Sequence, residues 1–98
     1  MKVKEAIEII NNGNFDSLYE AEDAISGDTT KKIASELDPD HHRWYTVSAS
    51  VYQLEDGYVG ITGVSELNSE YMRYSDCGYP SEACEYEEFT TISYRPKE

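Results

Sequence analysis

The chain has 98 residues, with 20 Asp and Glu against 8 Lys and Arg, and its formal charge is therefore −12. A chain of this length buries only roughly 60–65% of its unfolded surface, which allows one modest core and excludes a large multi-step enzyme. The aromatic content of 12% is not that of a disordered acidic tail. We therefore expect residues 1–98 to form a single folded acidic domain.

Charge and hydropathy limit the location of the protein and its partners. No apolar run approaches the ~20 residues that a membrane span needs, and no signal-peptide apolar region follows Met1, so we expect a cytoplasmic protein without a membrane partner. Direct nucleic-acid binding needs a basic surface, which 8 basic residues among 20 acidic ones do not provide. We expect no direct contact with nucleic acid.

Two or three short helices are predicted in the first 40 residues. Apolar side chains recur at helical spacing over residues 3–10, and Asn11-Asn12-Gly13 is typical of a helix end. Ser17-Leu18-Tyr19-Glu20 matches the capping box that opens a helix, and Ser26-Gly27 ends it. A third helix is predicted over residues 30–37, from the spacing of its apolar residues and from the proline that follows Asp38.

From Tyr45 onward the period changes to that of a strand. Odd and even positions alternate in polarity, which predicts a strand with an inner face formed by Tyr45, Val47, Ala49 and Val51. Glu55-Asp56-Gly57 is typical of a hairpin turn before a second strand over residues 58–64. Gly60 and Gly63 in that strand suggest a bulge or the close approach of another group.

The last third of the chain is predicted to hold a long irregular segment and one more strand. Residues 65–85 show no clear period, and a final strand is expected over residues 86–94. Helices first and strands afterwards predict an α+β fold, in which two or three short N-terminal helices pack on one face of a three-stranded antiparallel β-sheet.

An acidic, tyrosine-rich segment is the candidate binding surface. Between residues 66 and 88 there are seven carboxylates against the single Arg73. Carboxylates can imitate phosphates and tyrosines are common interface anchors, so the segment suits a basic groove; the alternative is a plain solvated surface that serves solubility. The predicted partner-binding residues are Glu66, Glu70, Tyr71, Tyr74, Asp76, Glu82, Glu85, Tyr86, Glu87 and Glu88.

Other chemistry has little support in the sequence. Cys77 and Cys84 are expected to be free thiols in a reducing cytosol, with a disulfide or metal ligation as alternatives. His41 and His42 are the only histidines, no catalytic motif is present, and we expect neither an enzyme nor a cofactor or metal site. Trp44, the only tryptophan, is expected in the core.

Residues 44–52, 55–60, 63–64 and 91–97 resemble small acidic proteins of bacterial mobile genetic elements, namely phages, plasmids and conjugative elements of gut bacteria. The resemblance implies a mobile-element setting and no particular activity. Such elements often encode anti-CRISPR and anti-restriction inhibitors of host defence, and several of these inhibitors are nucleic-acid mimics.

Two functions follow as hypotheses. The first is a non-catalytic acidic protein that inhibits a nucleic-acid-binding defence protein, such as a nuclease, by occupying its basic surface as a nucleic-acid mimic. The second is a structural or regulatory interaction module, monomeric or a homodimer paired through a sheet edge, whose acidity serves only solubility.

Overall fold

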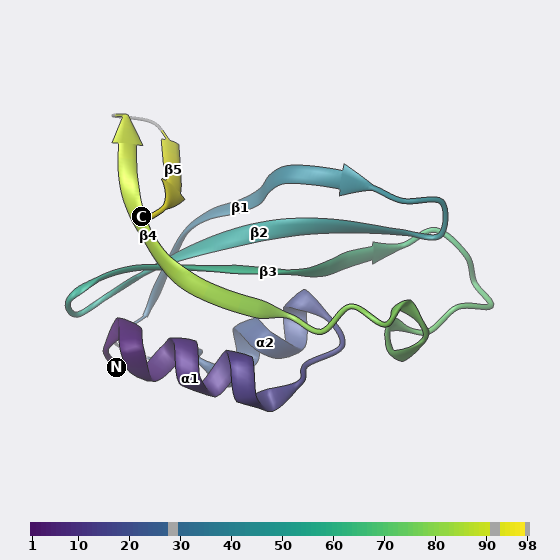
Figure 1. Ribbon diagram of the computed structural model, residues 1–98, viewed down its shortest axis with the longest axis horizontal. Coiled ribbons are helices and arrows are strands. Elements are labelled where there is room, and N and C mark those ends of the chain that lie inside the picture. The colour runs from purple at the N-terminus through teal and green to yellow at the C-terminus, as the bar shows by residue number, and fades with distance from the viewer. Residues whose placement is uncertain (28–29, 91–92, 98) are drawn as a thin grey trace.

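The computed structural model describes residues 1–27, 30–90 and 93–97, and for residues 88–90 and 93 it describes the backbone only. Two helices lie on one side of a curled antiparallel sheet (Figure 1). The sheet has five strands in the order β1-β2-β3-β4-β5. The prediction of a three-stranded sheet with up to three helices was therefore wrong in the number of strands and in the third helix.

The two predicted helices are confirmed. Helix α1 spans Val3–Gly13 and ends at Asn14, whose φ of 49° is left-handed. Helix α2 spans Leu18–Ala24, and the Ser17 hydroxyl accepts a hydrogen bond from the Glu20 amide, as the capping box requires. Their apolar stripes pack on the sheet and form one core cluster with residues of β2, β3 and β4, which includes Ile10, Leu18, Ile25, Tyr52 and Ile61.

The segment predicted as a third helix is strand β1, Lys31–His41, an edge strand paired with β2, Tyr45–Leu54. Register shifts in β1 leave Ala34, Leu37 and Asp40 as successive partners of every second residue of β2. Because bulges insert extra residues, the period of β1 becomes three instead of two, and this resembles helical spacing. The bulges therefore explain why the helix prediction was wrong.

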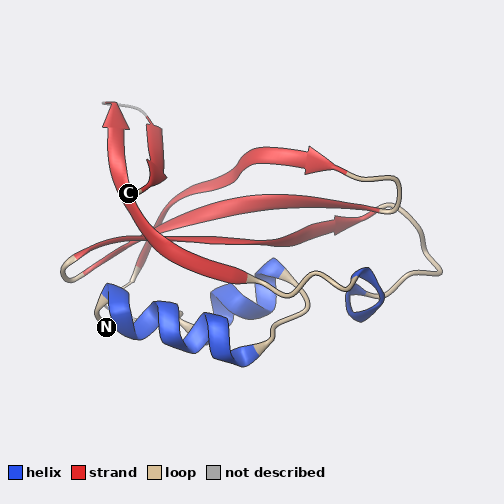
Figure 2. Cartoon of the chain, in the orientation of Figure 1, coloured by secondary structure: helices blue, strands red, loops and turns tan. Residues whose placement is uncertain are grey.

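The predicted hairpin at Asp56-Gly57 is confirmed, since Leu54 of β2 pairs with Gly57 of β3, Gly57–Leu67. Strand β4, Glu82–Thr90, pairs with β3 and turns back into β5, Ser93–Pro96. The single final strand predicted over residues 86–94 is thus two paired strands, and positions 91–92 of that prediction lie outside the described residues. The predicted irregular segment is shorter than expected and holds one 3-10 turn, η1, at Tyr74–Cys77 (Figure 2).

Both faces of β2 are buried, although one was predicted to face solvent. The helices cover the face of Tyr52 and Leu54, while Val47 and Val51, on the opposite face, are also buried. On that opposite face the ring of Tyr86 lies over Gly60, and a Cβ at Gly60 would lie within 2.5 Å of the ring. The close approach predicted at this glycine is confirmed, and the curled sheet buries apolar residues on both sides.

Polar contacts fix the helices to both ends of the sheet. At the hairpin end, the Val3 amide at the start of α1 donates to Asp56 Oδ1 over 2.9 Å. At the other end of α1, the Asn11 side chain donates to the Ala83 carbonyl and accepts from the Ala83 amide. The Ser81 hydroxyl, packed against Gly63, donates to the Ser17 carbonyl.

Candidate protein-binding surface

The structure divides the predicted partner-binding residues between two places. Glu66 pairs with Thr46 near the end of β3, whereas Glu85 of β4 pairs with Val59, which lies seven residues before Glu66 on β3. At roughly 3.3 Å per residue, these two positions are about 23 Å apart along β3. The first group, beside the β3–β4 connection, holds Glu66, Glu70, Tyr71, Tyr74 and Asp76; the second, on β4, holds Glu85, Tyr86, Glu87 and the backbone of Glu88.

Residues of the second group are engaged within the chain. Glu87 forms an ion pair with Arg95 at 3.2 Å, and Lys97 Nζ lies 3.6 Å from Glu85 Oε2. Tyr86 packs on Gly60 and hydrogen-bonds with Thr62. These carboxylates are therefore partly neutralised, and the described part of β4 does not present a row of free acidic groups. Glu82 is exposed at the start of β4, between the two groups.

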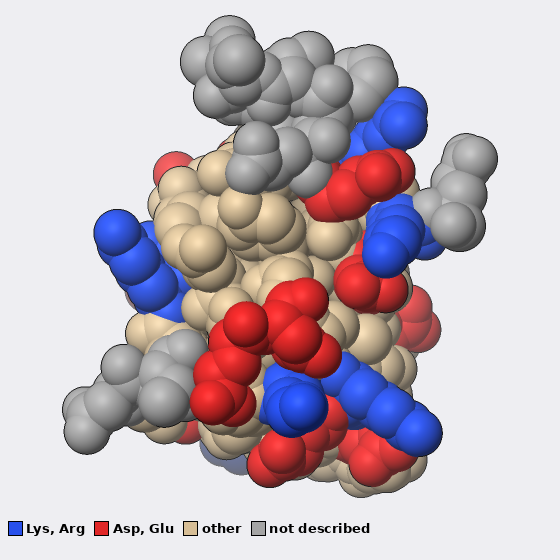
Figure 3. Space-filling view, turned by 90° about the vertical axis from the view of Figure 1, so that its left-hand side faces the viewer, with Lys and Arg blue, Asp and Glu red and all other residues tan. Residues whose placement is uncertain are grey.

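The first group belongs to a larger surface that we call the acidic end, formed by residues 36–44 and 66–80. These residues carry six carboxylates and two arginines, which is a net charge of −4. Residues 1–8, 31–32, 53–58, 84–87 and 94–97, toward the other end of the sheet, carry six carboxylates and six basic side chains. Figure 3 shows that opposite end, where acidic and basic side chains lie next to one another. The acidic end therefore carries an excess of carboxylates, whereas the charges of the opposite end balance.

Large aromatic side chains are exposed at or beside the acidic end. Trp44, in the turn between β1 and β2, is 46% exposed, Tyr71 is 90% exposed, and Tyr19 at the start of α2 is 48% exposed. The prediction that Trp44 belongs to the core was wrong, because the turn carries it beyond the last pair of the β1–β2 ladder. The Arg43 guanidinium covers one face of the indole, 4.6 Å from the ring centroid.

Hydrogen bonds hold the two loops of the acidic end together. The Asn68 amide donates to the Trp44 carbonyl over 2.7 Å, and the Asn68 side chain donates to the His42 carbonyl. In the 3-10 turn, the Arg73 amide donates to Asp76 Oδ2 over 3.0 Å. Because these bonds already restrict the two loops, less conformational entropy is lost when the surface binds a partner.

The electrostatic environment links Tyr74 to the rest of the surface. Burial raises the pKa of Tyr74, and the nearby Tyr19, Cys77 and Glu66 raise it further. Groups of α2, β3 and η1 thus act on the Tyr74 hydroxyl. Tyr74 remains a neutral phenol at neutral pH and offers both an apolar ring and a hydrogen-bonding tip.

The cysteines are free, as predicted from the sequence. Burial, followed by the charges of Asp76 and Asp16, raises the pKa of the Cys77 thiol, and burial together with Glu82 raises that of Cys84. Both groups are therefore thiols and weak nucleophiles at neutral pH. Within the described ranges, no group of three or more His, Cys, Asp or Glu side chains is arranged to hold a metal ion.

Comparison of the chain with protein-family models, with curated proteins and with solved structures finds no match. In the part of the chain that the structure describes, no helix has both the length and the apolar character to cross a membrane.

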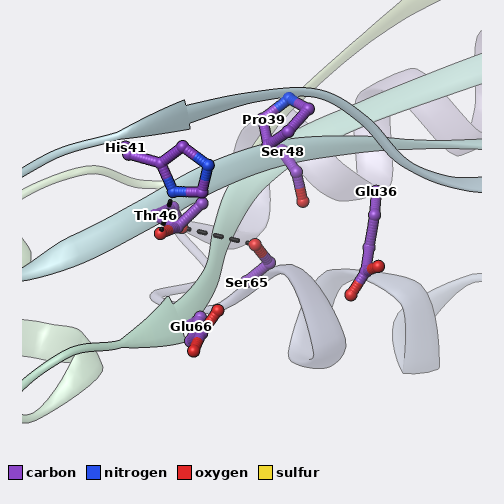
Figure 4. A pocket seen from close by; sticks show the side chains of 7 residues that line it. All are labelled: Glu36, Pro39, His41, Thr46, Ser48, Ser65 and Glu66. Atoms are coloured by element: carbon purple, nitrogen blue, oxygen red, sulfur yellow. Dashed lines mark hydrogen bonds between the residues drawn. The ribbon is translucent and has the colours of Figure 1, made fainter.

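Sequence reasoning missed a polar cavity beside the acidic end (Figure 4). The cavity has a volume of about 190 Å³ and lies between β1, β2 and β3, where it is lined by Glu36, Pro39, His41, Thr46, Ser48, Ser65 and Glu66. Ser48 was assigned to the solvent face of its strand, and Glu36 to a helix. With β1 placed wrongly, no pattern in the sequence could bring these two residues together.

Proposed function

We propose that the protein is a non-catalytic binding protein whose acidic end occupies a basic, nucleic-acid-binding surface of a partner protein. The observation that carries the proposal is the coincidence of exposed aromatic rings and unbalanced carboxylates at one end of the sheet. Exposed large aromatic side chains are informative because most are buried, and Trp and Tyr are enriched among residues that dominate interface energies.

The charge pattern supports a basic partner surface. The net charge of −4 at the acidic end attracts a positive patch and repels nucleic acid. Glu66 and Glu70 are exposed there, whereas Glu85 and Glu87 have ion-pair partners within the chain. The contact surface is therefore proposed to contain Glu66, Glu70, Tyr71, Tyr74 and Asp76, with Trp44 added.

The resemblance to mobile-element proteins supports a defence nuclease, or a related nucleic-acid-binding protein, as the partner. Inhibition then follows from competition, because a surface that holds the acidic end cannot hold a nucleic-acid backbone at the same time. The association is expected to be fast and to weaken with salt.

The alternative function, a homodimer paired through a sheet edge, has less support from the described edges. Strand β1 contains Pro39 and three register shifts, and strand β5 is only four residues long and ends at Pro96. Bulges, proline and short length are the features that make an edge a poor template for pairing with another strand.

The test is capture of the partner from nuclease-treated bacterial lysate at low and high salt, with added DNA or RNA as competitor. We expect the chain to retain a basic nucleic-acid-binding protein that salt and nucleic acid both release. Recovery of only the protein itself, or of a partner that resists salt and nucleic acid, would contradict the proposal.

A further inference from the structure

Two buried serine hydroxyls on β2 have no hydrogen-bond partner in the described structure. Ser48 and Ser50 are 2% and 1% exposed, and the Oγ atom of each is unpaired. A buried hydroxyl without a partner is unfavourable, and such groups in native proteins are usually satisfied by water or by a ligand. Two of them on the same face of one strand therefore indicate a place that accepts a polar group from outside.

The bulges of β1 create this place. Between the pairs Ala34–Val51 and Leu37–Ala49, two residues of β1 lie opposite Ser50 alone, and the next register shift sets two residues opposite Ser48. Glu36 and Asp38 adopt left-handed φ values of 53° and 44°, which are costly for residues with a side chain. Pro39 has no amide to donate. Strand β1 thus leaves the regular ladder next to each of the two serines.

The space left by the bulges consists of two adjoining cavities. The larger, of about 190 Å³, includes Ser48, and the smaller, of about 80 Å³, includes Ser50; Glu36 and Ser65 line both. In Figure 4 the hydroxyl of Ser48 points into the space between the Glu36 and Glu66 side chains. The larger cavity is roughly six times the ~30 Å³ that one water molecule occupies in the liquid.

The walls offer more acceptors than donors. Glu36 and Glu66 contribute carboxylates, and Ser48 contributes a hydroxyl that can accept. The Nδ1 atom of His41 already has a partner, since it lies 3.1 Å from Thr46 Oγ1, and the Lys32 ammonium lies 3.0 Å from Glu22 Oε1. A ligand that brings several donors and a positive charge fits such walls best.

We propose that the cavity binds the guanidinium group of an arginine side chain of the partner. A guanidinium has five N–H donors in one plane and no acceptor, which suits a cavity lined by the Glu36 and Glu66 carboxylates and the Ser48 hydroxyl. The inference rests on the proposed function for the origin of the arginine, because a basic surface that binds nucleic acid is rich in this residue. The cavity adjoins the acidic end through Glu66, which belongs to both.

The test uses the full chain, labelled with ¹⁵N and titrated with Nα-acetyl-arginine amide. We expect saturable shifts of backbone amide signals at residues 36–48 and 65–66. Nα-acetyl-citrulline amide, which has nearly the same shape without the charge, serves as the control probe. Absence of saturable shifts, or equal binding of the citrulline probe, would overturn the proposal.

Variants assign the binding to the cavity. Glu36→Gln removes one charged acceptor and is expected to weaken binding of the arginine probe about tenfold, which is typical for loss of a charged hydrogen-bond partner. Glu5→Gln, at an exposed position of α1, is the matched control and is expected to leave the affinity unchanged. Ser48→Ala is expected to weaken binding while the free protein stays folded. An unchanged affinity in Glu36→Gln would contradict the assignment.

Failure of this inference can be told from failure of the proposed function. If Glu36→Gln and the citrulline probe show that the cavity binds no guanidinium, yet salt-sensitive capture of a basic partner persists, only the cavity assignment falls. If the arginine probe binds as expected but lysate yields no partner released by salt and nucleic acid, the cavity stands as an arginine site and the proposed function falls.

Discussion

Gly60→Ala tests the packing of the sheet's second face. A Cβ at position 60 would lie 2.0–2.3 Å from three ring atoms of Tyr86, whereas carbon atoms pack best at about 3.5–4.0 Å. The ring would have to move by roughly 1.5 Å and would lose its hydrogen bond with Thr62. We expect a loss of about 2–4 kcal/mol in the free energy of unfolding, the sum of overpacking and one lost hydrogen bond.

The sign of the effect should reverse when the ring is removed. A Tyr86→Ala background removes the three ring atoms nearest to the new methyl group, and replacing a strand glycine by alanine is then expected to stabilise by about 0.5–1 kcal/mol. Gly27→Ala is the matched control, because no atom lies within 4 Å of a Cβ there. Urea unfolding followed by far-UV circular dichroism measures all five proteins, namely the unchanged protein, the two single variants, the double variant and the control. Equal destabilisation by Gly60→Ala in both backgrounds would refute the packing of Tyr86 on Gly60.

Three further predictions concern the ends of the elements and their titration. Asp56→Ala should lower the free energy of unfolding by about 1 kcal/mol, measured by thermal unfolding, since Asp56 Oδ1 accepts from the Val3 amide at the start of α1. Asp56→Asn keeps an acceptor and should lower it less. Equal losses in the two variants would contradict the capping role of Asp56. The Met1 ammonium, through its hydrogen bond and its charge, lowers the pKa of the Glu55 carboxyl below 4.5. Because the pKa is lower in the folded state, this stabilisation is present above pH 4.5 and is lost as the pH falls. The difference in Tm between the unchanged protein and Glu55→Gln should therefore shrink on acidification. A constant difference would contradict the ion pair between the Met1 ammonium and Glu55. Burial, followed by the charges of Glu22 and Asp23, raises the pKa of Tyr52 to about 12. Because the pKa is higher in the folded state, the neutral phenol contributes fully to the stability of the fold below pH 10, and this contribution is lost as the pH rises toward 12. The pKa values of Tyr74, Tyr79 and Tyr86 are raised as well. Absorbance titration should therefore show a tyrosine transition near pH 12 that is missing in Tyr52→Phe, and its persistence in that variant would contradict the assignment.

The sequence identified the helices and the central hairpin because their signals are local. The hydroxyl of Ser17 and the amide of Glu20 are three residues apart, and the turn at Asp56-Gly57 depends on the backbone of those residues. Strand β1 could not be recognised, because its bulges give it a period near that of a helix. The burial of Ser48 and Ser50 depends on helices packed from elsewhere in the chain, which alternation within one strand cannot reveal.

The candidate surface could likewise be predicted only in part, because it depends on contacts between segments that are distant in the sequence. Composition identified an acidic, tyrosine-rich segment, but most of it was predicted to lie in the irregular segment 65–85, whereas β4 begins at Glu82 and takes the second part of it along the sheet. Pairing of Glu87 with Arg95 and of Glu85 with Lys97 depends on the β4–β5 hairpin, which was predicted as a single strand. The exposure of Trp44 depends on the turn between β1 and β2, so misassigning β1 also concealed this residue.

The most direct measurement of the central claim is the affinity of the captured basic partner for two charge-reversal variants over a range of salt concentrations. Glu66→Lys with Glu70→Lys changes the acidic end, and Glu5→Lys with Glu8→Lys makes the same change of charge at exposed positions of α1. We predict that the first variant binds at least about tenfold more weakly, or 1.4 kcal/mol, with a shallower dependence on salt, and that the second binds nearly as the unchanged protein does. Equal losses in the two variants would show that the acidic end is not the binding surface.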